Sequence, residues 1–243
     1  MGDSPTIRVS ENHILFSHPC FQHYIRIPDR ICSSLDFFDR SYNRTIVHEI
    51  LTSFYLFIGI VDHAMDCISI SIASDVLHQL KQPNSFSEIT LKVPFELATE
   101  LLKRNIHPTV YDAVLDRFSR LCDAVFHERC SKRISEYIVQ RKKIGFLTAE
   151  ISYLLIQPYL TVTDLEIREF FCKVGETGCL VDSLIDLRSD YRKGLTNFRF
   201  NLSSYLGVLI HAVISGVPLL LRYPKLIQIF YEAVLDNCRD IKR

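Results

Sequence analysis

Two groups of aspartates are the residues whose type and spacing are best suited to chemistry. Asp62 and Asp66 are four residues apart, and Asp182, Asp186 and Asp190 repeat that spacing later in the chain. Residues four apart share one face of a helix, so each group would present its carboxylates together. Both groups lie in apolar sequence, where an unpaired carboxylate is costly. Carboxylates facing each other across a helical bundle suit a hard divalent cation, and we expect Mg²⁺.

A basic run and an apolar wall accompany the aspartates. Arg141-Lys142-Lys143 precedes the second group and predicts contacts to an anion. Gly175 and Gly178 fit either close approach of a ligand or tight helix packing. Together these features predict a site for a diphosphate that carries an isoprenoid chain. The residues expected to line its pocket are Phe54, Tyr55, Phe57, Ile58, Gly59, Tyr153, Phe171, Gly175, Gly178 and Cys179.

Long helices separated by short breaks are predicted throughout, which makes this an all-α protein with a single domain over residues 1–243. A capping box at Thr163 and Glu166 begins one helix, which continues through Asp190 and stops at Gly194. Residues 205–221 are the most apolar segment, and we interpret them as a buried core helix rather than a membrane span. The other helices are expected at 30–41, 45–80, 94–105, 108–127, 128–157, 202–221 and 224–240, with a loop at 81–94.

Composition narrows the class of protein. Lys+Arg and Asp+Glu both number 28, so the net charge is zero and no bulk attraction to nucleic acid is expected. The eight cysteines form no C-x-x-C pair, which favours reduced thiols in a cytoplasmic protein. The N-terminus lacks the basic and apolar stretches of a signal peptide. Peripheral contact with a membrane and formation of a homodimer both stay open.

The two aspartate motifs resemble those of the class I isoprenoid synthase superfamily. Within it, the likeness is closest to the squalene/phytoene synthase branch. The segment YLFIGIVDHAMD (55–66) matches the Tyr, the Phe and two aspartates of that branch's first motif. Gly59 stands where the family has Arg, and His63 where it has Asp. In the second motif Gly175, Asp186, Asp190 and Gly194 match, whereas Asp182 replaces Asn and Cys179 replaces Gln.

The second group also resembles the metal triad of class I terpene cyclases. Asp182, Asp186 and Asp190 have the triad's spacing, and Arg192 or Lys193 follows as the basic residue. The segment YIVQR (137–141) is similar to the cyclase helix whose arginine senses the diphosphate. Arg222-Tyr223 is similar to the cyclases' late Arg-Tyr pair. The V-A-G motif of head-to-head synthases is missing, and Arg141-Lys142-Lys143 lies in its place.

These resemblances imply a Mg²⁺-dependent terpene synthase, a lyase that ionises a prenyl diphosphate. The five aspartates would bind Mg²⁺, and the diphosphate would be held by Arg141, Lys143, Arg192 and Lys193. The alternatives are a prenyltransferase of head-to-head or head-to-tail type, and a non-catalytic homologue that kept only the bundle. The absence of any Glu-x-x-His from the chain argues against a di-iron carboxylate bundle.

Overall fold

The computed structural model describes residues 22–38, 41–67, 92–161 and 165–240, and within these ranges every regular element is a helix. The all-α expectation is confirmed for this part of the chain. The α-helices are α2 (Gln22–Ile25), α3 (Ile27–Leu35), α4 (Arg44–Cys67), α6 (Lys92–Asn105), α7 (Tyr111–Cys130), α8 (Ile134–Ile156), α9 (Leu165–Lys193), α10 (Leu202–Arg222) and α11 (Leu226–Asp240). Two 3₁₀ turns, η2 (Pro108–Val110) and η3 (Gln157–Tyr159), flank α7 and α8.

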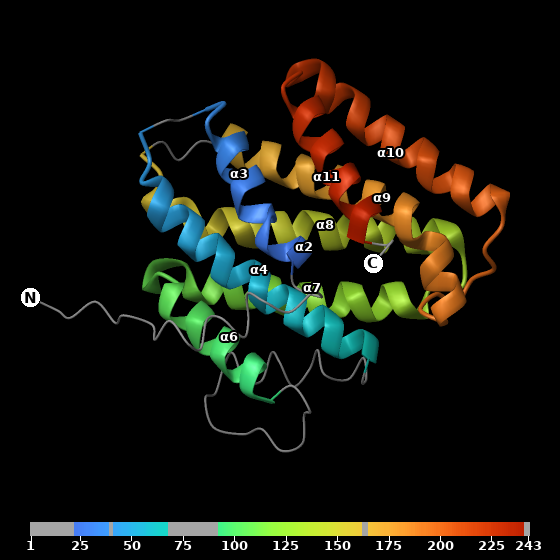
Figure 1. Ribbon diagram of the computed structural model, residues 1–243, viewed down its shortest axis with the longest axis horizontal. Helices are drawn as coiled ribbons and strands as arrows, with labels where there is room; N and C mark the ends of the chain where they lie inside the picture. The colour runs from blue at the N-terminus through green and yellow to red at the C-terminus, as the bar shows by residue number, and fades with distance from the viewer. Residues whose placement is uncertain (1–21, 39–40, 68–91, 162–164, 241–243) are drawn as a thin grey trace, which may run out of the picture.

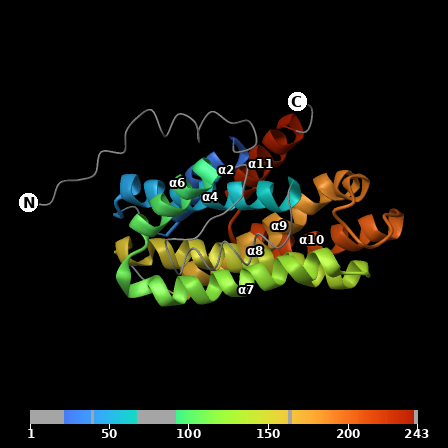
Figure 2. The ribbon, with the colours of Figure 1, turned by 90° about the horizontal axis from the view of Figure 1, so that it is seen from below.

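The helices form a bundle whose middle is the pair α8 and α9 (Figure 1). On one side, α7 packs along α8, and α4 joins α8 and carries α6, α3 and α2 on its other faces. On the other side, α10 packs against α9, and α11 contacts both α9 and α2. Figure 2, seen at right angles, shows α7 lying along α8 over most of the length of the molecule. The two helices that carry the aspartate groups, α4 and α9, therefore flank α8.

Several predicted boundaries differ from the structure. The first helix was expected at 30–41, but α3 begins earlier and ends earlier, at Leu35; Pro28 is in its first turn, where a proline needs no N–H partner. The predicted junction at 127 and 128 is wrong because α7 continues to Cys130. There Ser131 adopts an extended conformation, and Glu136 accepts the backbone N–H of Arg133 to begin α8. The predicted loop at 81–94 is also too long by three residues, since α6 begins at Lys92.

Other predicted features are confirmed or fall outside the described residues. Gly194 ends α9 with φ +73°, a left-handed conformation that favours glycine, and the Leu195 N–H bonds the Asp190 carbonyl at 2.9 Å. The cysteines that the structure describes are free thiols. The capping residue Thr163, the end of the predicted helix 45–80 beyond Cys67, and the loop before Lys92 lie outside the described residues.

The largest core cluster joins α4 to its neighbours through aromatic side chains. Phe54 and Phe57 are buried and both meet Phe118 of α7 edge to face, at 5.8 and 5.7 Å between ring centroids. Burying a side chain of this size contributes roughly 1.5 to 3 kcal/mol. These contacts fix α4 against α7 and so set the direction in which Asp62 points.

The interpretation of residues 205–221 as a buried core helix is wrong for most of their side chains. Along α10 the residues that face α9, such as Ala212 and Gly216, are buried, but the opposite face is apolar and exposed. By length and composition, α10 and the Arg44–Met65 part of α4 are both apolar enough to cross a membrane. Only α4 has its apolar side chains mostly in the core.

Candidate functional site

A cavity of about 370 Å³ lies among α2, α3, α4, α8, α9 and α11. Asp62 of α4, Arg141 of α8 and Asp182 of α9 supply charged groups to its wall. Most of the remaining lining is apolar or aromatic, and it includes Tyr55, Ile58, Ile144, Phe170, Phe171, Val174, Gly175, Gly178, Cys179, Leu226, Ile229 and Phe230. The cavity therefore brings together one member of each aspartate group and one member of the basic run, which the sequence keeps apart; Asp186 and Asp190 do not line it.

Asp62, Arg141 and Asp182 lie toward one end of this cavity. Asp62 follows Tyr55 by seven residues on α4, which is about 10 Å along a helix, and Asp182 follows Phe171 by eleven residues on α9, about 17 Å. The Tyr55 hydroxyl contacts Ser152 of α8 at 3.0 Å, eleven residues beyond Arg141 on that helix. Tyr55 and Phe171 thus lie at the end away from Asp62 and Asp182, as an amphipathic ligand with an anionic head would require.

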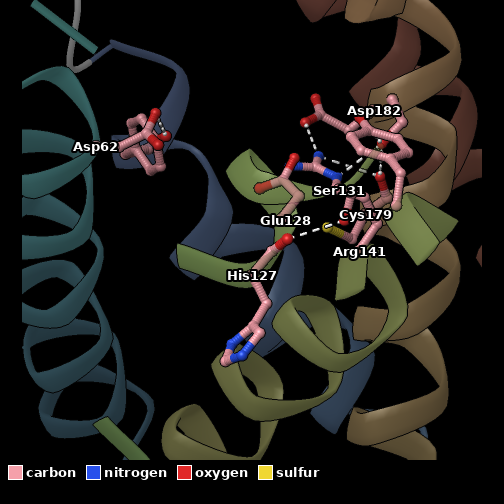
Figure 3. A network of polar contacts seen from close by, with 10 residues as sticks. Asp62, His127, Glu128, Ser131, Arg141, Cys179 and Asp182 are labelled. Atoms are coloured by element: carbon pink, nitrogen blue, oxygen red, sulfur yellow. Dashed lines mark hydrogen bonds and ion pairs between the residues drawn. The ribbon is translucent and has the colours of Figure 1, made fainter. Parts of the chain in front are cut away.

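Arg141 is the centre of the polar end (Figure 3). Its Nε donates to the Ser183 hydroxyl at 2.7 Å, and its Nη2 donates to the Asp182 carboxylate at 3.1 Å and to the Cys179 carbonyl at 3.3 Å. Nη1 lies 3.8 Å from the Glu128 carboxylate of α7. The guanidinium therefore joins α7, α8 and α9 in one contact.

The surroundings of Arg141 are arranged to keep it charged. Burial by itself would lower the pKa of this guanidinium, but the negative groups around it, Glu128 and Asp182 among them, raise the pKa well above its ordinary value. The Tyr137 hydroxyl, one turn earlier on α8, donates to Ser183 at 3.2 Å, and Ser183 donates to the Cys179 carbonyl at 2.9 Å. These bonds hold the arginine in one orientation.

Asp62 lies across the cavity from this group (Figure 3). The Tyr24 hydroxyl donates to Asp62 Oδ2 at 2.8 Å. The Tyr24 ring covers Gly59, where an added Cβ would lie 2.6 Å from the ring atom Cδ2. Gly59 is thus a contact for an aromatic ring of α2 rather than part of the cavity wall. The predicted partner of Asp62, Asp66, is on the same helix one turn later, and its side chain lies outside the described residues.

The three aspartates of α9 share one face, as their spacing predicts, and they repel one another. The pKa of Asp186 rises from 3.8 to about 7, first because its carboxyl is partly buried and then because Asp182 and Asp190 are negative. Lys193, one turn beyond Asp190, acts on Asp186 in the opposite direction. A further cation at this face would relieve the repulsion.

The two glycines of α9 have different roles. An added Cβ at Gly175 would lie 2.2 Å from the Gly145 carbonyl oxygen, and the reverse distance is also 2.2 Å. Gly175 and Gly145 therefore mark the point where the backbones of α9 and α8 nearly touch, which is tight helix packing. Gly178 has no atom within 4 Å of an added Cβ and lines the cavity. Close ligand approach fits only this second glycine.

Several predicted site residues lie elsewhere. Phe54, Phe57 and Tyr153 are core residues that do not line the cavity. Lys143, Arg192 and Lys193 are exposed and do not line it either. Arg222 and Tyr223 both bond Glu166, at 2.6 and 3.1 Å, rather than facing the carboxylates. Arg141 is therefore the member of the predicted basic set that the fold brings to the cavity.

Other residues at the cavity were not predicted. Tyr24 and Arg30 belong to the wall made by α2 and α3, and Arg30 pairs with Asp236 of α11 at 2.6 Å. Glu128 is the buried acid behind Arg141. The sequence carries a local signal only for the neighbours of Arg141 on its own helix, since Tyr137 and Arg141 are four residues apart and so share a helix face. The contacts of Arg30, Glu128 and Tyr24 join distant segments and leave no local pattern.

The carboxylates suit a hard cation in kind but form only part of a shell. Within the described ranges, no group of three or more His, Cys, Asp or Glu residues is arranged to hold a metal ion. Mg²⁺ commonly uses one or two protein carboxylates and completes its shell with water and phosphate oxygens. Asp62 on one wall and the α9 aspartates on the other fit that pattern if a diphosphate supplies the remaining oxygens.

Comparison of this chain with models of protein families, with curated proteins and with solved structures finds no match. The class I isoprenoid synthase resemblance therefore stands on the residues of the two motifs, and the all-helical arrangement agrees with it at the level of fold class.

Proposed function

We propose that this protein is a Mg²⁺-dependent class I terpene synthase that ionises a prenyl diphosphate and releases diphosphate. The observation that supports the proposal most directly is the cavity shared by α4, α8 and α9. It has Asp62, Arg141 and Asp182 toward one end and an aromatic and aliphatic lining at the other. A diphosphate head and an isoprenoid tail have the same polarity along their length.

Each group has a role that follows from its position. Asp62, with Asp66 one turn later, would hold Mg²⁺ from α4, and Asp182, Asp186 and Asp190 would hold it from α9. Bound Mg²⁺ would supply Lewis-acid stabilisation of the leaving diphosphate. Arg141 would donate hydrogen bonds to the same group, in exchange for part of its contact with Asp182.

The apolar end would control the reaction after ionisation. When the C–O bond breaks, its electron pair leaves with the diphosphate, and an allylic cation remains on the hydrocarbon. The aromatic faces of Tyr55, Phe170 and Phe171 can stabilise a cation, and their lining excludes water. Ring closure followed by loss of a proton completes a lyase reaction.

The cavity offers one continuous space of about 370 Å³ for a ligand. We expect the hydrocarbon chain of a prenyl diphosphate to bind against its apolar wall. Comparing substrates of different chain length then measures which one the cavity accepts.

The test is incubation of the purified protein with Mg²⁺ and geranyl, farnesyl or geranylgeranyl diphosphate, with hydrocarbon products and released diphosphate measured separately. Asp62→Asn and Asp182→Asn should lower turnover by about 10²-fold or more, in line with loss of groups that stabilise developing charge. Asp123→Asn, a change of an exposed aspartate on α7, is the matched control and should leave turnover unchanged.

Three results would contradict the proposal. Wild-type turnover in Asp62→Asn and Asp182→Asn would remove these residues from the reaction. A product with the summed carbon number of two substrates would favour the transferase. The non-catalytic alternative has its own support, because Arg141 is already paired with two carboxylates and Tyr24 already bonds Asp62. The third contradicting result is the one that this alternative predicts: no turnover, and no rise in Tm when Mg²⁺ and pyrophosphate are added.

A further inference from the structure

The outer face of α10 is an extended apolar surface. Nine large apolar side chains on this helix are exposed, at 37 to 78% of their full area. At 100° per residue all nine fall within about half of the helix circumference, and Ser203 is the polar residue that shares this arc. No charged residue occurs from Leu202 to Leu221. We call these nine residues the α10 face: Leu202, Tyr205, Leu206, Leu209, Ile210, Val213, Ile214, Val217 and Leu221.

The size of the α10 face exceeds what monomers usually expose. A half-exposed side chain of this kind leaves on the order of 100 Å² in water, so the nine together expose roughly 900 Å². The largest apolar patch on a soluble monomer is about 300 to 600 Å². A stable dimer of ordinary size buries about 800 Å² from each partner. The α10 face alone therefore supplies the area that a stable dimer needs.

The position of α10 favours a protein partner over a lipid one. The helix is held against α9, where an added Cβ at Gly216 would lie 3.2 Å from Thr177, and Figure 1 shows it along the edge of the bundle. Spanning a membrane from there would carry the charged residues of α9, such as Lys173 and Glu176, toward the hydrocarbon. Lying flat on an anionic membrane normally involves a cationic rim, but here the ends of α9 and α10 mix acids with bases, as in the Arg222–Glu166 pair.

We infer that the α10 face is the interface of a homodimer, in which a second copy of this chain packs its own α10 across the first. In a two-fold dimer the same surface meets itself, so an uncharged apolar strip is self-complementary. The middle of the helix, at Ile210 and Val213, then lies near the two-fold axis. The charged groups at both ends form the polar rim that protein interfaces have. This inference does not depend on the proposed function.

The test compares molar masses in solution by light scattering during size-exclusion chromatography without detergent. The wild-type chain should elute with twice the 28.2 kDa of one chain. Val213→Glu and Ile210→Lys should elute as monomers, because each would bury a charge at the axis. Val139→Lys changes a side chain of α8 that is 60% exposed and off the α10 face, and it should stay dimeric.

Circular dichroism measures the helix content of each variant, and so distinguishes a folded helical monomer from an unfolded chain. A second experiment uses Val213→Cys in a Cys130→Ser background, which removes an exposed thiol. We expect this variant to form a disulfide-linked dimer under mild oxidation. A monomeric wild type, a dimer that Val213→Glu and Ile210→Lys leave intact, or a monomer that cosediments with vesicles of phosphatidylcholine and phosphatidylglycerol would each overturn the inference.

Discussion

Tyr24 donates its hydroxyl to Asp62 while its ring covers Gly59, so one residue of α2 holds both the acid and the backbone of α4. Gly59 has no side chain, and the Tyr24 ring fills the space that a larger residue would occupy. The glycine on α4 and the orientation of Asp62 are therefore linked through Tyr24.

Gly59→Ala should displace Tyr24, because the new Cβ would lie 2.6 Å from the Tyr24 ring. We expect a loss of about 1 to 3 kcal/mol in the free energy of unfolding, typical of overpacking. In a Tyr24→Ala background the same change should be neutral or stabilising, since alanine favours a helix by up to about 1 kcal/mol over glycine. Urea denaturation of the two single variants and the double variant measures the coupling. Additive effects would show that the ring does not cover Gly59.

Gly145→Ala should destabilise the protein strongly, whereas Gly178→Ala on the facing helix should not. Its Cβ would lie 2.2 Å from the Gly175 carbonyl oxygen, and backbone cannot rotate away as a side chain can. Separating α8 from α9 should lower the free energy of unfolding by about 3 kcal/mol and the Tm by roughly 6 to 12 °C. Gly178→Ala is the matched control, because it meets open space and should stabilise the helix by about 0.5 to 1 kcal/mol. Similar Tm values for the two variants would contradict this packing.

Arg141→Met should leave two carboxylates without their shared partner. Glu128 is 12% exposed and Asp182 is 37% exposed, so the loss should be about 2 kcal/mol, below the ~3 to 5 kcal/mol found when a fully buried pair is broken. Lys143→Met, on the exposed side of the same helix, should change the free energy of unfolding by less than about 0.5 kcal/mol. Adding Glu128→Leu to Arg141→Met should recover part of the loss. Equal effects of Arg141→Met and Lys143→Met would show that the basic run is a solvated surface throughout.

Local signals in the sequence were enough to predict helices and much of their order. The stop at Gly194 needs only a left-handed residue, and the long apolar sequence of α4 predicts a helix without reference to its neighbours. The failures come from tertiary contacts. Residues 205–221 are apolar enough for a core, but the sequence does not reveal that the part of the chain that the structure describes leaves the outer face of α10 uncovered.

The candidate site likewise has features that local sequence predicts and features that depend on tertiary contacts. Spacing alone places the α9 aspartates on one face, and order along the chain brings Asp62 opposite Asp182 once α4 and α9 flank α8. Spacing does not say which side of α4 faces the cavity: both Phe54 and Tyr55 were expected in the wall, but Tyr55 lies there and Phe54 is in the core. Likewise the turn between Arg141 and Lys143 carries one side chain into the cavity and the other into solvent.

Asp186 gives the metal-free protein a specific dependence on pH. Its folded-state pKa of about 7 lies above the ordinary value of 3.8, so between these two values the folded protein keeps a proton that the unfolded chain has released. The free energy of unfolding should therefore fall as pH rises from about 4 to about 7 and show no further change from this group above that range. Asp186→Asn should remove this component, so the variant should gain stability relative to the wild type as pH rises through the same window.

Urea denaturation in the presence of a chelator, at intervals from pH 4 to pH 8, measures the effect, with Asp123→Asn as an exposed control whose profile should follow that of the wild type. Asp190→Asn removes one of the charges that raise the pKa of Asp186 and should move the wild-type slope to lower pH. Parallel profiles for Asp186→Asn and the wild type would mean that neither burial nor the negative charges of Asp182 and Asp190 raise the pKa of Asp186. The positive charge that we propose between them would then have no repulsion to offset.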